Sequence, residues 1–459
     1  LLVSLQDLGA AGLTSSSSEM AAKGGVGLDI DCSKVPLREP GMKPFEIMVS
    51  ESQERMLCVV APDRVAEVIA VCERWETLAT PIGEVTHSGR LRVLSHGEAV
   101  ADLPVGILVD DCPLYDLEPA EPVGEPLYAP APPVLRGDEA PDEVLLRLLG
   151  SANVASRRPV FEQYDPVVQS RTVRRPDEAD AAVLVLPTGE AIAVAIDGNG
   201  RRVACDPRRG AAEAVYECAA NLACVGATPL GLTNCLNFGN PEKPHVAWQL
   251  TEAVEGLATA CRTLGVPVVG GNVSLYNEAP TGPIFPTPVI GMVGRLPDPA
   301  RAGRLGFADE GDVVALVGDL RGASRAGSEL AKLQGREIAG PLPETDEAEV
   351  RAAHDTVRSL INSGALHSAH DIAEGGLAVA LAECCVAGGM GAAVRLPDGL
   401  DPFAEAPGRA FVVSGPEAAL EGLPVIGRVG GDALEIEGLL KLAVSDMRRV
   451  RDRGLAQFL

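Results

Sequence analysis

A motif near the start of the chain occurs again far downstream, and this repeat limits the possible folds more than any other feature. Residues 6–13 (QDLGAAGL) match residues 370–377 (HDIAEGGL), and the match continues without a gap to Gly27 and Gly391. The units of solenoids and propellers are roughly 20–50 residues long. A repeat separated by hundreds of residues therefore predicts tandem copies of whole domains.

The first copy reads as an apolar strand ending at Asp7, a glycine turn and a helix of small residues. Ser16 and Glu19 have the spacing of a capping box, and Gly25 can supply a left-handed helix end. An Asp at a strand end above a glycine turn is a common position for a Mg²⁺ or phosphate-linked site. An isolated Asp of this kind more often only caps a turn, but its recurrence as Asp371 makes it part of the fold.

A second pair of matching segments shows that the two copies differ. Residues 51–60 (ESQERMLCVV) align with residues 405–414 (EAPGRAFVVS), and the apolar strand is kept while Ser52 and Gln53 become Ala and Pro. A structural role requires only the strand, whereas contacts with a ligand require the Ser and Gln. We therefore interpret the first copy as the functional one and the second as a degenerate, structural copy.

Composition sets further limits. The 459 residues predict about three domains, and a net charge of −25 argues against a nucleic-acid or anionic-membrane partner. The 11 cysteines and six histidines show no metal-motif spacing, which is typical of a reduced, cytoplasmic protein. The sequence contains no run of 18 apolar residues, so we expect no transmembrane helix. Any anionic substrate must be held by Mg²⁺, backbone NH groups or single cations.

Strands and helices alternate along the chain, which predicts an α/β or α+β fold with mixed sheets. We expect helices at residues 63–78, 210–225 and 246–264, and a buried strand at residues 266–269. Residues 113–141 contain eight prolines and predict a linker. The chain starts within a strand and without Met, so we expect it to be the carboxyl-terminal part of a longer protein, with something like 200 residues upstream.

Two polar segments are further candidates for chemistry. Residues 270–274 (GGNVS) follow the predicted strand, and their two glycines would let the backbone approach a phosphate closely. Residues 234–240 are rich in amides and are expected to form a loop beside residues 270–274. A purely structural turn network of Asn side chains would have the same sequence pattern. No nucleophile constellation is visible, and His370, which aligns with Gln6, is expected to be structural.

Four segments together resemble a known family. Residues 6–17, 50–56, 236–244 and 270–278 closely resemble the PurL family, the synthetase subunit of phosphoribosylformylglycinamidine synthase. The family has tandem PurM-like (AIR synthase-related) domains, in agreement with the repeat. The resemblance implies the carboxyl-terminal-type domain at residues 1–142, including the linker, the amino-terminal-type ATP-binding domain at 143–300, and a degenerate carboxyl-terminal-type copy at 301–459.

The resemblance implies an ATP-dependent ligase of de novo purine biosynthesis. The amide oxygen of formylglycinamide ribonucleotide (FGAR) is phosphorylated by ATP with Mg²⁺, and ammonia then displaces the phosphate to give formylglycinamidine ribonucleotide (FGAM). Phosphoryl transfer of this kind depends on positioning and charge neutralisation, in agreement with the missing nucleophile.

The resemblance also implies roles for individual residues. Asp7 would bind one Mg²⁺ and Asn272 the other. Asn234 and Gly271 would contact ATP; many family members carry Asp at the first of these positions, and an amide there adds no negative charge. The expected FGAR-binding residues are Glu51, Ser52, Gln53 and Ser274.

The family's catalytic histidine lies in the leading domain of its first unit, which has no counterpart here. We therefore expect no catalytic residue in this chain and no turnover by the chain alone. The expected partners are FGAR, ATP, a separate glutaminase subunit (PurQ) that supplies ammonia and a small bridging subunit (PurS). Nucleic acid and membranes are not expected, and the expected location is the cytoplasm.

Two alternatives remain at this point. Another synthetase of the superfamily, such as AIR synthetase, has the same two-domain unit, but it pairs single units by dimerisation, and the tandem repeat argues against it. The second alternative is a non-catalytic scaffold module whose pseudo-symmetric site holds a structural nucleotide. Binding of FGAR would distinguish an enzyme from a scaffold.

Overall fold

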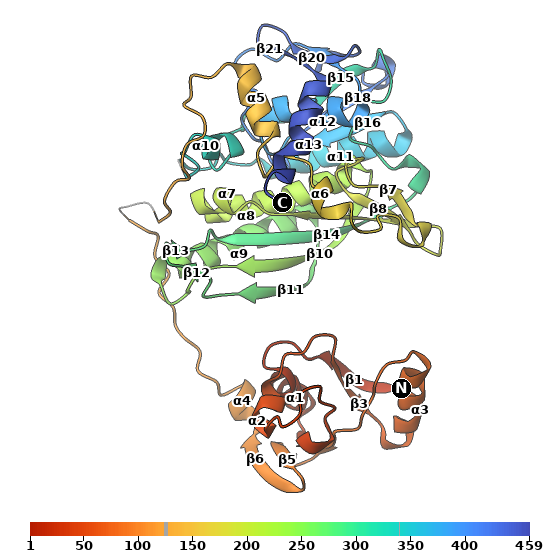
Figure 1. Ribbon diagram of the computed structural model, residues 1–459, viewed down its shortest axis with the longest axis vertical. Coiled ribbons are helices and arrows are strands. Elements are labelled where there is room, and N and C mark those ends of the chain that lie inside the picture. The colour runs from red at the N-terminus through yellow and green to blue at the C-terminus, as the bar shows by residue number, and fades with distance from the viewer. Residues whose placement is uncertain (124–126, 339) are drawn as a thin grey trace. The chain divides into compact units, whose positions relative to one another are not determined.

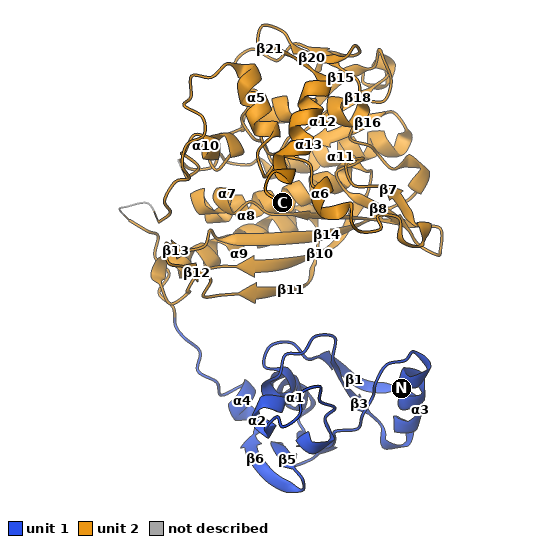
Figure 2. Cartoon of the chain, viewed as in Figure 1, with its two compact units in different colours: residues 1–116 blue, residues 117–459 orange. Residues whose placement is uncertain are grey.

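The computed structural model describes residues 1–123, 127–338 and 340–459, and residues 124–126 of the predicted linker lie outside this description. The chain divides into two compact units, Leu1–Asp116 and Leu117–Leu459 (Figure 2). Figure 1 shows the ribbon of each unit and labels many of its helices and strands. No helix among the described residues is long and apolar enough to cross a membrane.

Unit 1 has two small sheets covered by short helices. Its elements are β1 (Leu2–Asp7), α1 (Gly12–Gly24), β2 (Gly27–Asp31), η1 (Cys32–Lys34), α2 (Pro44–Val49), β3 (Met56–Val60), η2 (Pro62–Arg64), α3 (Val65–Arg74), β4 (Gly83–Thr86), β5 (Arg90–Ser95), β6 (Glu98–Pro104) and α4 (Val105–Val109). Strands β1 and β3 pair antiparallel, and the second sheet has the order β4-β2-β5-β6. Apolar residues of α1, β2 and β5, among them Leu13, Ile30 and Val93, form the core.

Unit 2 begins with short elements and a six-stranded sheet. Its elements up to residue 301 are α5 (Pro141–Leu149), α6 (Arg158–Phe161), η3 (Val168–Ser170), β7 (Thr172–Arg174), β8 (Ala182–Val185), β9 (Ala191–Asp197), α7 (Gly200–Cys205), α8 (Pro207–Cys224), β10 (Thr228–Asn237), α9 (Pro244–Leu264), β11 (Val268–Ser274), β12 (Glu278–Ala279), β13 (Gly282–Pro283), β14 (Thr287–Leu296) and η4 (Pro299–Arg301). The sheet order is β11-β10-β14-β9-β8-β7. One face carries α8 and α9, whereas the other bears exposed apolar side chains such as Val269 and Ile196.

The carboxyl-terminal part of unit 2 contains a seven-stranded sheet. Its elements are β15 (Val313–Gly318), α10 (Glu329–Leu333), α11 (Glu347–Ser363), β16 (Ser368–Asp371), α12 (Gly376–Gly388), β17 (Ala392–Val394), β18 (Ala410–Gly415), η5 (Glu417–Ala419), β19 (Val425–Val429), β20 (Ala433–Ile436), β21 (Leu440–Ala443) and α13 (Val444–Ala456). Helix α12 is apolar on all sides because it is buried between the sheet, α5 and α13.

The duplication predicted from the sequence is visible in the strand pairing. In unit 1, β2 pairs antiparallel with β4 and parallel with β5, and β5 pairs antiparallel with β6. In unit 2, β17 pairs antiparallel with β19 and parallel with β20, and β20 pairs antiparallel with β21. Helices α1 and α12 each have 13 residues and end at left-handed glycines, Gly25 and Gly389. The two modules therefore share one topology.

The helices α8 and α9 lie where the sequence predicts them, but four local predictions are wrong. Helix α1 starts after Ala11, so the predicted capping box at Ser16 falls inside the helix. Helix α3 is shorter than predicted and exposed on much of its surface. Strand β11 is an exposed edge strand rather than a buried one. Asn234 lies on strand β10 rather than in a loop, because backbone pairing with β11 continues through the amide-rich segment.

Helix α5 shows where the amino-terminal part of unit 2 packs. Its residues Val144, Leu145 and Leu148 are buried with Leu377 and Met447 in the core of the carboxyl-terminal copy. The segment that follows the predicted linker therefore contributes to the last module of the chain. The domain boundaries at residues 142 and 300 themselves remain predictions.

Candidate functional site

The turn after Asp7 lies against the loop that contains Glu51. The turn passes through Ala11 and Gly12, which have φ values of 56° and 53°. A Cβ atom on Gly12 would lie 2.0 Å from the carbonyl oxygen of Ser50, so only glycine allows this approach. Asp7 is exposed at the end of β1, and its backbone carbonyl accepts a hydrogen bond from Ser16 Oγ at 2.7 Å. The structure thus brings together two motifs that are about forty residues apart in the sequence.

The Glu51 carboxylate is used within the protein itself. Its Oε1 accepts a hydrogen bond from the backbone N–H of Ala11 at 2.9 Å. The side-chain amide of Gln53 donates to the carbonyl of Glu51 at 3.2 Å, and the hydroxyls of Ser50 and Ser52 are 3.4 Å apart. Residues 51–53 are exposed, so the Ser52 hydroxyl and the Gln53 amide can reach a ligand while Glu51 fixes the turn.

The two candidate ATP contacts are neighbours on adjacent strands of unit 2. Strands β10 and β11 are parallel, and Asn234 pairs with Gly271. Gly271 has a φ of 156°, and a Cβ atom there would lie 2.4 Å from Asn234 Oδ1. A side chain at position 271 would therefore displace the Asn234 amide.

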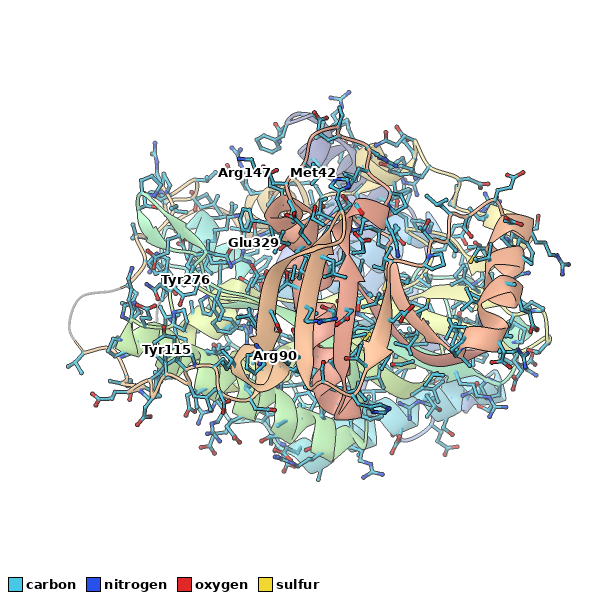
Figure 3. The ribbon with its side chains drawn as sticks, turned by 90° about the horizontal axis from the view of Figure 1, so that it is seen from below. Met42, Arg90, Tyr115, Arg147, Tyr276 and Glu329 are labelled. Atoms are coloured by element: carbon cyan, nitrogen blue, oxygen red, sulfur yellow. The ribbon has the colours of Figure 1, made fainter. Side chains whose placement is uncertain are left out.

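The same strand pair places the other two candidates. Cys235 pairs with Asn272, and Asn237 pairs with Ser274, at the carboxyl ends of β10 and β11. Ser274 Oγ donates to Asn277 Oδ1 at 3.4 Å, which orders the turn. The turn closes at Tyr276, whose hydroxyl donates to Glu242 at 3.1 Å (Figure 3).

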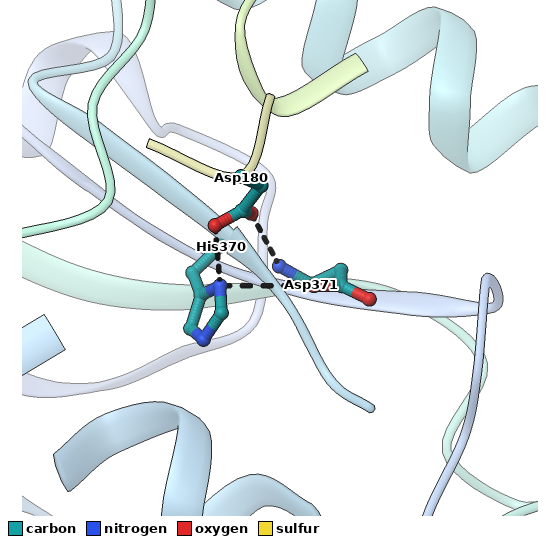
Figure 4. Close-up of side chains that lie close together, drawn as sticks. All are labelled: Asp180, His370 and Asp371. Carbon is teal, nitrogen blue, oxygen red and sulfur yellow. Dashed lines mark hydrogen bonds and ion pairs between the residues drawn. The ribbon is translucent and has the colours of Figure 1, made fainter. Parts of the chain in front are cut away.

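A second polar cluster lies in the degenerate copy, around His370 and Asp371 (Figure 4). His370 Nδ1 is 2.9 Å from Asp180 Oδ1, and His370 Nε2 is 3.2 Å from Glu383 Oε2. Burial lowers the pKa of His370, but the charges of Asp180 and Glu383 outweigh it and hold that pKa well above its usual value. The predicted structural role of His370 fits these contacts.

Asp371 belongs to a group of buried carboxylates that repel one another. Burial, followed by the charge of Asp180, raises the pKa of Asp371 to about 8. Burial and the neighbouring carboxylates also raise the pKa values of Asp197 and Glu217 well above their usual range. Asp371 Oδ2 is buried without a hydrogen-bond partner among the described residues. Such an arrangement favours a bound cation over ionised carboxylates alone.

A cleft opens beside these carboxylates. It has a volume of about 610 Å³, and its lining includes Asp197, Asn199, Arg201, Lys332 and Glu374. Asn199 Nδ2 donates to Glu374 Oε1 at 3.3 Å. Carboxylates and cations thus line one cleft, which suits an anionic ligand held together with a divalent cation.

The comparisons with known proteins identify the domains. The model described as AIR synthase related protein, N-terminal domain, matches residues 178–296. The model described as AIR synthase related protein, C-terminal domain, matches twice, at residues 1–96 and 309–436.

The chain belongs to the AIR synthase related protein family.

The order of the three matches confirms the predicted fold class, with the carboxyl-terminal domain-type on both sides of the amino-terminal one. The two carboxyl-terminal matches include both copies of the duplicated module. Asp7 and Asp371 are thus equivalent positions of one domain type.

The relatives are phosphoribosylformylglycinamidine synthase subunits. The chain is 46% identical over 452 residues to the PurL subunit of Moorella thermoacetica, covering 95% of this chain and 61% of the relative. It is 45% identical to the PurL subunit of Thermomicrobium roseum, covering 99% of this chain and 65% of the relative. The resemblance to PurL is therefore confirmed, and the chain spans less than two thirds of the length of these curated relatives.

Solved structures give the same result. The PurLQS structure from Thermotoga maritima has a TM-score of 0.67 and 27% identity, covering 94% of this chain and 64% of that one. T. maritima PurL complexed with FGAR has a TM-score of 0.66 and 27% identity, covering 94% and 62%. T. maritima PurL complexed with ATP has a TM-score of 0.65 and 27% identity, covering 94% and 64%.

Sequence reasoning missed most of the second cluster. Asp180 lies in an acidic stretch that resembles a solvated surface, and Glu217 is one of two carboxylates in helix α8, one turn after Glu213. Carboxylates surrounded by small and apolar residues in one helix were the available sign of a buried role for Glu217. Glu374 belongs to the repeated glycine turn, where an Ala occupies the first-copy position.

Proposed function

We propose that this chain supplies substrate- and nucleotide-binding parts of a phosphoribosylformylglycinamidine synthase. The reaction converts FGAR, ATP and ammonia to FGAM, ADP and phosphate: the amide oxygen accepts the γ-phosphoryl group, ammonia attacks the amide carbon, and phosphate leaves. The observation that carries the proposal is the β10–β11 pairing, which places Asn234 beside Gly271 and orders Asn272 and Ser274 at one strand end. The PurL relatives support the same assignment.

The proposed nucleotide contacts follow from the backbone at that strand end. Gly271 leaves the Asn234 amide uncovered, since a Cβ atom at position 271 would lie 2.4 Å from Asn234 Oδ1, and this amide would contact ATP. Asn234 can donate to or accept from the nucleotide, but it adds no charge. Ser274 and the exposed Ser52 and Gln53 would bind FGAR.

The candidate Mg²⁺ ligands fit a hard cation. Asp7 is exposed, and among the described residues neither the Asp7 carboxylate nor the Asn272 side-chain oxygen has a hydrogen bond within the protein. Oxygen atoms of carboxylates and amides are the ligands that Mg²⁺ prefers. Asp7 would hold one Mg²⁺ and Asn272 another, and each bound ion would neutralise phosphate charge.

Ammonia is proposed to come from glutamine through a separate glutaminase subunit of the PurQ type, with a PurS-type bridging subunit. The similarity to the PurLQS structure from Thermotoga maritima supports this proposal. The free cysteines among the described residues agree with a cytoplasmic reaction.

A second binding function is proposed for the degenerate copy, on the unpartnered Asp371 oxygen and the cleft beside it. The cleft would hold a divalent cation with a nucleotide phosphate as a structural group. The scaffold alternative is thereby kept for the second copy only, because the first copy has Ser52 and Gln53. Both copies of the module lie in one chain, which argues against AIR synthetase.

The test joins this chain to the part of the Moorella thermoacetica relative that it does not match, here called the joined protein. We expect ATP- and Mg²⁺-dependent FGAM formation from FGAR and ammonium by the joined protein, and none by the chain alone. A folded joined protein that binds nucleotide but neither binds nor converts FGAR would overturn the enzyme proposal in favour of the scaffold.

A further inference from the structure

We propose that Arg55 is a positioning residue that fixes the FGAR-binding loop, residues 50–53, and connects it to the Asp7 turn. The inference rests on the proposed function, because it adds a residue to the same site. Arg55 itself is not expected to touch the substrate. It acts through the backbone of the residues that do.

The contacts of Arg55 reach both motifs of unit 1. Its Nε donates to the carbonyl of Ser52 at 3.0 Å, and its Nη2 donates to the carbonyl of Ser50. Its own carbonyl accepts a hydrogen bond from the N–H of Leu8, the residue after Asp7, at 3.0 Å. One residue therefore spans the substrate loop with its side chain and anchors the metal-ligand turn with its backbone.

The loop needs such support because its backbone is strained. Glu54 has a φ of 63°, a left-handed conformation that non-glycine residues rarely adopt. Residues 51–54 are exposed and form no regular structure. Hydrogen bonds from a guanidinium are charge-assisted and stronger than neutral ones. In the part of the chain that the structure describes, Arg55 forms no ion pair with a carboxylate, so its donors remain directed at the loop.

The degenerate copy indicates that this clamp serves the ligand contacts rather than the fold. Arg409 aligns with Arg55 in sequence, but the strand pairing places Ala410 at the position of Arg55, because Asp7 pairs with Met56 and Asp371 pairs with Phe411. The Arg409 side chain donates to the carbonyl of Glu344 at 3.0 Å and to Glu213 Oε1 at 3.0 Å. These partners lie outside its own loop, where Ala and Pro replace Ser52 and Gln53. An arginine follows the loop in both copies, but it holds its loop only in the copy that has the polar residues.

The chemistry of the clamp requires arginine. The planar guanidinium presents several N–H donors in a fixed fork, which lets it bind two carbonyls at once. A lysine ammonium is a point charge on a flexible chain and would hold one carbonyl well at most. Arg55→Lys should therefore retain part of the effect, and Arg55→Met should retain none.

The experiment compares Arg55→Met and Arg55→Lys in the joined protein by steady-state kinetics. We expect Arg55→Met to raise KM for FGAR by about tenfold or more, with kcat and the KM for ATP changed by less than about twofold. Arg55→Lys should fall between. Arg64→Met is the matched control, since among the described residues Arg64 of the same unit pairs with exposed Glu67 alone, at 2.7 Å.

Three results would overturn the inference. The first is an unchanged KM for FGAR in a folded Arg55→Met protein. The second is a parallel change of kcat and both KM values with a lower melting temperature, which would make Arg55 merely structural. The third, if Arg55→Met does not fold, is an Arg55→Lys protein with unchanged KM for FGAR. A wild-type joined protein without FGAR binding would instead refute the proposed function, before any variant is compared.

Discussion

The two copies of the carboxyl-terminal domain-type differ in what surrounds the same turn. In the first, Glu51 accepts the N–H of Ala11 at 2.9 Å, and the loop around it is exposed. In the second, Glu405 accepts the N–H of Gly375 at 2.9 Å and that of Glu329 at 2.9 Å, and it is buried. The carboxylate that fixes the turn is common to both copies, so the turn belongs to the fold.

The carboxylates of Glu51 and Glu405 differ in their environment. Burial raises the pKa of Glu405 to about 7, although the neighbouring Arg202 opposes this shift. Arg202 is itself buried and bound to Glu213 at 2.7 Å. The second copy has thus become an internal support within unit 2. The comparison shows that a duplicated module can keep the geometry of its turn while the carboxylate that fixes the turn is exposed in one copy and buried in the other.

The largest difference between the copies is expected at the repeated aspartate. In the joined protein, Asp7→Asn should lower kcat about a thousandfold, a loss of ~4 kcal/mol, because a metal ligand is lost. Asp371→Asn is the matched variant and should lower kcat less than about tenfold. Initial rates of FGAM formation at saturating Mg²⁺ would measure both. Equal losses would show that the two copies are functionally equivalent.

Removal of the two arginines that align in sequence, Arg55 and Arg409, should separate stability from binding. Arg409→Met leaves the buried Glu213 with one cationic partner fewer and should destabilise unit 2 by about 3 kcal/mol, whereas Arg55→Met should destabilise unit 1 by about 1 kcal/mol. Trp75 lies in unit 1 and Trp248 in unit 2. Urea unfolding monitored by tryptophan fluorescence would measure each unit by itself. A Trp248→Phe background leaves the signal of unit 1, and a Trp75→Phe background leaves the signal of unit 2. A larger loss in unit 1 would contradict the comparison.

Conversion of the first loop to the second should weaken substrate binding. Ser52→Ala with Gln53→Ala removes polar groups that are absent from the second copy, and KM for FGAR should rise about 10- to 100-fold in the joined protein. Ala406→Ser, the reverse change, should leave KM unchanged. If the double variant retains the wild-type KM, loop residues 52–53 do not bind FGAR.

The smallest expected effect is a dependence of stability on pH that comes from the second copy. The pKa values of Asp371 and Glu405 are raised to about 8 and about 7, so the folded state binds these protons more tightly than the unfolded state. The raised pKa of His370 acts in the same direction. The contribution of these groups to the free energy of unfolding is therefore fully present below about pH 4 and is lost as the pH rises towards about 8.

We expect the melting temperature of the metal-free chain to fall by about 2 °C between pH 6 and pH 8.5, and Mg²⁺ to restore it more at pH 8.5 than at pH 6. Asp371→Asn should reduce the pH dependence. Differential scanning calorimetry would measure these shifts. A melting temperature that rises with pH in the wild type and the variant alike would rule out this carboxylate cluster as the cause.

The sequence alone was sufficient to predict the duplication, the family and the order of the domain types. These features depend on long matching segments, and the glycines of the turn retain their spacing because left-handed conformations at Gly12 and Gly376 require them. The helices α8 and α9 were also predictable, since their apolar periodicity extends over several turns.

Only the tertiary structure decided which polar residues are buried together. Asp180, Glu217 and Asp371 come from segments far apart in the chain, and their shared environment arises from the packing of α8 against the carboxyl-terminal sheet. The same holds for Arg55 and Arg409, which are equivalent in sequence but bind different carbonyls. A sequence motif specifies the local backbone conformation, whereas the partners of a side chain depend on which distant segments pack against it.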